Sequence, residues 1–70
     1  MKEILTYTVE NTGPEDSPVL YTVSRYDKIQ VEDVVKNNQI VHEVTEPGIY
    51  QVKTYAQNDE EVSISTYEYQ

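Results

Sequence analysis

The sequence predicts an all-β domain, a small antiparallel sandwich or open barrel of about six strands. Val, Ile, Thr and Tyr supply 29 of the 70 residues, against one Ala and two Leu. These β-branched and aromatic side chains suit a pleated, half-buried surface better than a helix. Turn-forming residues recur at intervals of about eight to twelve positions, which is typical of short strands in a sandwich or barrel.

The length bounds the domain organisation. Seventy residues fit one domain spanning 1–70, and a domain of this size has a thin core. There is no cysteine, so disulfides and thiolate zinc sites cannot supplement the packing. No apolar stretch resembles a secretion signal or a membrane span. We therefore expect a cytoplasmic location for the chain as written, and an extracellular one if it is excised from a larger surface protein.

Alternation of apolar and polar residues predicts the first two strands. The first covers 2–10 and the second covers 19–26, and they are joined by the loop 11–18, which is rich in Asn, Gly and Pro. One face of the first strand carries Leu5, Tyr7 and Val9, and one face of the second carries Val19, Tyr21 and Val23. A bend at 27–28 precedes a third alternating segment.

Residues 31–41 allow two structures. Val31, Val34 and Val35 have the spacing of one or two helical turns. We favour a hairpin across Asn37–Asn38 that pairs the valines with the segment after it. Asn tolerates the positive φ angles of a type I′ turn, and valine favours strands.

The only histidine falls in the following strand, 39–45. The predicted hairpin would place His42 opposite Asp33, and that carboxylate would raise the pKa of the imidazole. We interpret the two as a cross-strand polar pair. Because no cysteine and no nucleophile motif accompany this histidine, the sequence predicts no catalytic residue, no cofactor and no enzyme activity.

The segment Glu46-Pro47-Gly48 predicts a turn that sets the register of the last two strands. Proline presets the first central φ, and glycine accepts a positive second one. A three-residue loop at 58–60 would then bring Val62 and Ile64 onto the inner face. The residues left together on the outer face would be Lys53, Tyr55, Tyr67 and Tyr69.

The run EPGIYQVKTYAQN, from residue 46, resembles the sixth strand of bacterial immunoglobulin-like modules, including the polycystic-kidney-disease type, and the resemblance extends to about Tyr69. It implies that the Tyr50 hydroxyl returns to the backbone a few residues upstream and that Val52 points into the core. Structural roles for Pro47 and Gly48 follow from the same resemblance, as does a non-catalytic module for adhesion, spacing or protein binding.

The net charge of −8 disfavours direct binding to nucleic acid or to anionic membranes. The acidic residues gather in turns, and the last such turn contains Asp59, Glu60 and Glu61, a candidate acidic loop. The ordered carboxylate spacing of a calcium loop is absent, so no metal site is predicted.

Tyrosine is enriched at protein interfaces because it combines a large flat surface with a hydroxyl that can stay hydrated. We therefore predict a non-catalytic, acidic protein-interaction module that uses its tyrosine-rich face or its open edge strand. The candidate binding residues are Lys53, Tyr55, Tyr67 and Tyr69. The edge would also allow a homodimer. The alternatives are an acidic inhibitor, encoded by a phage, that mimics nucleic acid and blocks a basic site on a host enzyme, and a sugar-binding or spacer module of a surface protein.

Overall fold

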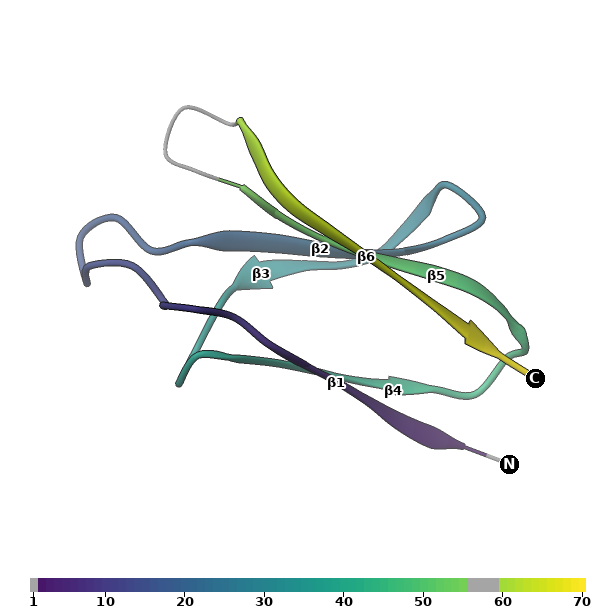
Figure 1. Cartoon of the computed structure of the whole chain (residues 1–70). Coiled ribbons are helices and arrows are strands. Elements are labelled where there is room, and N and C mark those ends of the chain that lie inside the picture. Colours follow the sequence, from purple (N-terminus) through teal and green to yellow (C-terminus); the bar gives the residue numbers. More distant parts are fainter. Residues whose placement is uncertain (1, 56–59) are drawn as a thin grey trace.

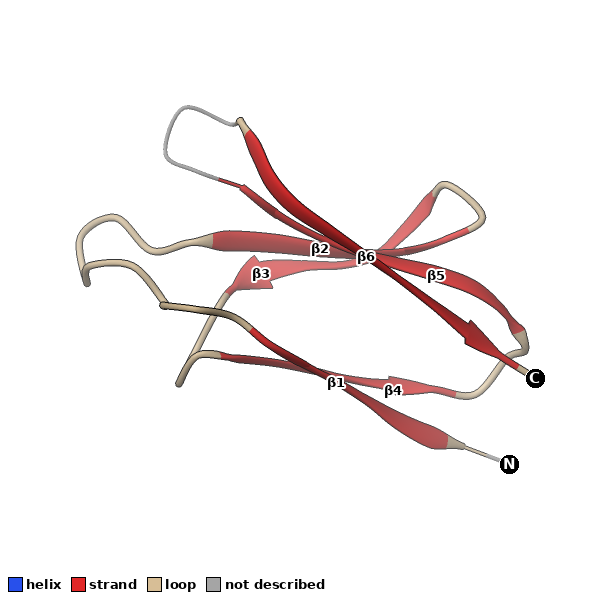
Figure 2. Cartoon of the chain, viewed as in Figure 1, coloured by secondary structure: helices blue, strands red, loops and turns tan. Residues whose placement is uncertain are grey.

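Six antiparallel strands form two sheets in the computed structural model, which describes residues 2–55 and 60–70 (Figure 2). No helix occurs in these ranges. The strands are β1 (Glu3–Thr8), β2 (Leu20–Arg25), β3 (Lys28–Val34), β4 (Gln39–Val44), β5 (Gly48–Tyr55) and β6 (Glu61–Tyr69). The predicted all-β sandwich is thus confirmed.

The two sheets differ in size. The larger has the strand order β3-β2-β5-β6, and the smaller pairs β1 with β4 (Figure 1). The inner faces of the sheets meet in a core of eight buried apolar residues: Leu5, Tyr21, Val23, Val35, Ile40, Val44, Tyr50 and Val52. Burying one such aliphatic or aromatic side chain contributes about 1.5–3 kcal/mol, which is a large fraction of the stability of a small domain.

The connection from β3 to β4 crosses between the sheets. Asn37 and Asn38 have φ angles of 55° and 58°, and the Gln39 amide donates to the Lys36 carbonyl at 3.0 Å. The predicted asparagine turn is therefore present, and the helix alternative is wrong.

The predicted pairing across this turn is also wrong. Val34 pairs with Leu20 in the large sheet, whereas Val41 pairs with Thr6 in the small one. The Val35 amide still donates to the Val19 carbonyl at 2.8 Å. A local turn looks the same whether its arms pair with each other or with other strands, so the turn residues do not reveal the crossing.

The connection from β4 to β5 bends at Glu46 instead of forming a tight two-residue turn. Gly48 begins β5 with a φ of 152°. A Cβ at this position would lie 2.8 Å from Arg25 Nε. That guanidinium donates to the Pro47 carbonyl, with a distance of 2.6 Å from Nη2. Glycine is favoured here because other residues rarely adopt this φ and because the arginine side chain lies over the backbone.

The predicted register of β5 and β6 is wrong by one residue. Tyr50 pairs with Tyr67 and Val52 pairs with Ser65, and a one-residue shift turns every side chain of a strand over. Tyr67 and Tyr69 therefore lie on the inner face and pack against the core. Two tyrosines can bury more apolar area there than Val62 and Ile64 would. A bulge between Thr54 and Tyr55 accommodates the shift. The predicted loop residue Asp59 lies outside the described residues.

Candidate functional site

The outer face of the four-stranded sheet, turned away from β1 and β4, carries exposed apolar side chains. Leu20 is 39% exposed, Ile29 is 61% exposed and Ile64 is 50% exposed. Pairing places Leu20 between Val34 and Tyr55 in one cross-strand row. In the next row Thr22 lies between Glu32 and Lys53, and Lys53 in turn lies beside Ile64.

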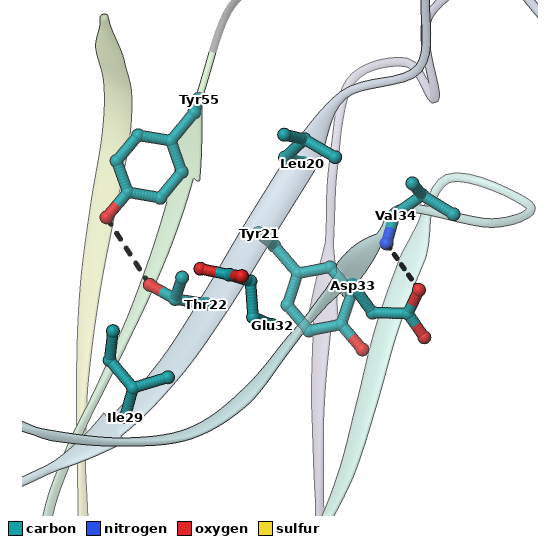
Figure 3. A pocket seen from close by; sticks show the side chains of 8 residues that line it. All are labelled: Leu20, Tyr21, Thr22, Ile29, Glu32, Asp33, Val34 and Tyr55. Atoms are coloured by element: carbon teal, nitrogen blue, oxygen red, sulfur yellow. Dashed lines mark hydrogen bonds between the residues drawn. The ribbon is translucent and has the colours of Figure 1, made fainter. Parts of the chain in front are cut away.

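A shallow groove of about 350 Å³ runs across β2, β3 and β5 on this face (Figure 3). Leu20 and Val34 line one end, and Ile29 lines the other. Buried Thr22 lies between them, and its hydroxyl is 3.4 Å from the Tyr55 hydroxyl. This hydrogen bond holds the phenol group of Tyr55 at the border of the groove. The groove is therefore mainly apolar, with a polar centre.

Acidic groups border the groove. Glu32 lines it and is exposed. Asp33 lies beside Tyr21, whose phenol has a pKa raised first by burial and second by that carboxylate (Figure 3). An apolar strip with carboxylates at its border suits a ligand with an apolar centre and a basic periphery.

Two of the four predicted binding residues lie on the outer face. Tyr55 borders the groove, and the Lys53 ammonium lies 3.4 Å from Glu61 Oε1. An exposed ion pair of this kind contributes only about 0–1 kcal/mol. The pair offsets one positive and one negative charge, so the acidic character of this face comes from Glu32 and Glu68. Of the predicted acidic loop, Glu60 and Glu61 are both exposed.

The other two predicted binding residues are not on this face. Tyr67 and Tyr69 are half-buried on the inner face. The Tyr67 hydroxyl donates to Glu3 Oε1 at 2.6 Å, and this hydrogen bond is the main cause of the raised pKa of the phenol. The prediction that Tyr55, Tyr67 and Tyr69 share one outer face is therefore wrong.

The residues singled out by the immunoglobulin-like resemblance have the geometry that it implies. The Tyr50 hydroxyl donates to the Glu46 carbonyl at 2.6 Å, four residues upstream. Val52 is buried in the core. Pro47 offers its carbonyl to Arg25, and Gly48 lets the arginine approach. These contacts tie the entry of β5 to the end of β2.

His42 lies on the inner face of the small sheet, opposite Leu5. The centroid of its ring is 6.4 Å from that of Tyr50. Burial lowers the pKa of the imidazole, and nearby Glu43 offsets part of this effect. The expected pairing with Asp33 and the expected rise in the pKa of His42 are both wrong, because β4 pairs with β1 and not with β3.

Within the described residues, no group of three or more His, Cys, Asp or Glu side chains is placed to hold a metal ion. No helix long and apolar enough to cross a membrane occurs there either.

The sequence patterns do not reveal the groove. Its residues come from three strands. Leu20 and Thr22 lie on the outer face of β2, whereas the alternation in this strand is set mainly by the apolar residues of its inner face. The one available signal is that the reverse positions of β2 and β3 include Leu20, Ile29 and Val34, where a hydrated face usually has polar residues.

Comparison with protein-family models, with curated protein sequences and with solved structures finds no match to this chain.

Proposed function

We propose that this protein is a non-catalytic protein-interaction module whose docking surface is the outer face of the four-stranded sheet. The observation that carries the proposal is the groove on this face, which is lined by the exposed side chains of Leu20 and Ile29. Ile64 is exposed on the same face, beside Lys53 on the far edge strand. Contiguous exposed apolar patches on soluble domains mark interaction sites. The groove beside Tyr55 gives the patch a shape that an apolar side chain of a partner can enter.

The charge of the chain defines the partner further. The protein carries a net charge of −8, and Glu32, Glu61 and Glu68 lie on or beside the outer face. A partner with an apolar centre surrounded by Lys and Arg complements this arrangement. Opposite charges at the border raise the association rate and fix the orientation of the partner.

The strand order supports the immunoglobulin-like resemblance. The orders β6-β5-β2-β3 and β4-β1 correspond to the strand orders G-F-C-C′ and E-B of an immunoglobulin-type sandwich. In this correspondence β5 is strand F, the strand that a tyrosine corner precedes, and Tyr50 is at its start. Modules of this type present their sheet faces and loops to other proteins. The proposal therefore includes membership of this structural class.

The test is capture of partners from the source lysate by the immobilised domain, with Ile29→Glu as the test variant. Ile4→Glu is the matched control, because Ile4 is similarly exposed but lies on the small sheet. We expect the wild type and Ile4→Glu to retain the same partner and Ile29→Glu to lose it. Retention by Ile29→Glu, or equal loss by both variants, would contradict the proposal.

Stepped salt elution separates this function from the inhibitor alternative. Salt weakens interactions between exposed charges but leaves apolar contacts in place. A partner held by the outer face should be released only partly by salt. A nucleic-acid enzyme that is released completely by salt, and that ignores Ile29→Glu, would instead indicate an acidic inhibitor. Binding to glycans alone would indicate the sugar-binding module.

A further inference from the structure

β6 is an edge strand whose free backbone groups can be located. The Tyr26 amide donates to the Ile49 carbonyl, so Ile49 is directed toward β2. Hydrogen-bonding direction alternates along an antiparallel strand. The neighbouring residues Gly48, Tyr50, Val52 and Thr54 are therefore directed toward β6, where they pair with Tyr69, Tyr67, Ser65 and Ser63. The backbone groups of Ile64, Thr66 and Glu68 consequently face away from the sheet.

The two edges of the large sheet are protected to different degrees. On β3, the outward Val34 amide donates to Asp33 Oδ1 at 2.8 Å. On β6, no side chain in the described ranges hydrogen-bonds to the outward backbone of Ile64, Thr66 or Glu68. β6 also contains no Lys or Pro, the residues that usually prevent strand addition at an edge.

The sequence of β6 allows this strand to pair antiparallel with β6 of a second copy of the chain. The segment 63–69 lies beyond the bulge and is regular. A two-fold axis through Thr66 would pair Thr66 with Thr66 of a second copy, and Ile64 with Glu68 of that copy. All of these residues direct their backbone groups outward, so the register forms hydrogen bonds on both chains. No carboxylate faces another carboxylate in this register.

In the same register, the side chains that face each other on the inner side of the sheet are complementary in size. Ser65 would lie opposite Tyr67 of the second copy, and Ser63 opposite Tyr69. Each small hydroxyl side chain leaves room for a ring that is only half-buried in the single chain. Self-complementary surfaces of this kind are the requirement for a two-fold dimer.

We infer that β6 pairs antiparallel with β6 of a second copy of this chain, centred on Thr66. The two four-stranded sheets then form one continuous sheet. The outer faces of the two copies become a single surface, and the docking surface proposed above is presented twice. This inference does not depend on that function, because it rests on the edge and not on the groove.

The experiment is sedimentation velocity from low-micromolar to near-millimolar protein. We expect the mass to rise from 8.1 kDa toward twice that value. Thr66→Pro removes an outward amide without removing a bond to β5, and it should stay monomeric with an unchanged amide circular dichroism spectrum. If that variant fails to fold, Thr66→Lys serves the same purpose by adding a charge to the edge.

Thr6→Lys is the matched control, because Thr6 is exposed on β1 of the small sheet. It should associate like the wild type. A chain that remains monomeric at every concentration overturns the inference, as does association that survives Thr66→Lys or that Thr6→Lys abolishes. If a monomeric chain loses its lysate partner on Thr66→Lys, the edge accepts a strand from that partner instead.

Salt distinguishes this dimer from the proposed partner binding. Two chains of net charge −8 repel each other, so added salt should strengthen the dimer. The same salt should weaken binding to a partner with a basic border. Weaker self-association in salt would overturn pairing between identical acidic chains without affecting the proposed docking face.

Discussion

The two faces of the four-stranded sheet are built from similar side chains but have opposite surroundings. Val23 and Val52 are buried on the inner face beneath the small sheet, whereas Leu20, Ile29 and Ile64 are exposed on the outer face. The chain therefore carries apolar residues on both sides of one sheet but covers only one side. Apolar character alone does not separate residues that stabilise the fold from residues that are free to bind.

The largest difference should appear between Ile40 of β4, which is buried between the two sheets, and Ile29 of β3, which is exposed on the outer face. Ile40 is 1% exposed beneath the large sheet, and Ile40→Ala should lower the free energy of unfolding by about 2–5 kcal/mol. Ile29→Ala on the outer face should change it by less than about 0.5 kcal/mol. Urea unfolding followed by circular dichroism measures both. Equal losses would show that the outer face is covered in the folded protein.

Gly48→Ala tests the contact that anchors β5 to the end of β2. The new Cβ would lie 2.8 Å from Arg25 Nε, in a backbone conformation that side chains rarely adopt. We expect a loss of about 1–3 kcal/mol in the free energy of unfolding. Thr45→Ala, an exposed change in the same connection, should cost less than about 0.5 kcal/mol. An unchanged Gly48→Ala domain would mean that the backbone at this position accepts a side chain and that the arginine moves aside without cost.

Tyr50→Phe removes one hydroxyl from the inner face. The Glu46 carbonyl would lose a hydrogen bond of 2.6 Å, and the expected cost is about 0.5–1.5 kcal/mol. Tyr26→Phe, at an exposed position, provides the matched change and should be nearly neutral. If both substitutions were equally mild in thermal unfolding, the Tyr50 hydroxyl would contribute nothing at the entry to β5.

The smallest effect concerns pH. Burial lowers the pKa of folded His42 below the ordinary value of 6.5, so the unfolded chain takes up a proton first as the pH falls. The free energy of unfolding should therefore decrease as the pH falls below about 6.5, and it should decrease less in His42→Gln. Nuclear magnetic resonance titration of the imidazole gives the direct check. A midpoint above 6.5 would place a carboxylate beside the ring.

Part of this fold can be predicted from the sequence because alternation groups the residues that share one face of a strand. In β1 and β2 the buried residues Leu5, Tyr21 and Val23 lie on the faces that alternation identifies, although Ile4 and Leu20 place apolar side chains on the reverse faces. The Pro-Gly entry to β5 likewise predicts the positions of Tyr50 and Val52.

The orientation of β6 cannot be predicted in the same way, because both of its faces compete for burial. Val62 and Ile64 occupy one set of positions, and Tyr67 and Tyr69 fall on the other. The choice depends on a bulge at Thr54 and on the hydrogen bond from Tyr67 to Glu3, which is 64 residues away in the sequence. The groove cannot be predicted for a related reason, since it exists only after three strands are placed in register.

The pairing of β1 with β4 has a consequence for how the chain folds. Glu3 pairs with Val44, so the small sheet closes only when most of the chain is already present. Ordering so long an intervening segment is slow, because its entropy is lost before the distant contact forms. During synthesis β1 leaves the ribosome well before its pairing strand. During that interval the side chains of Ile4 and Leu5 are exposed, and chaperones and neighbouring nascent chains can bind them.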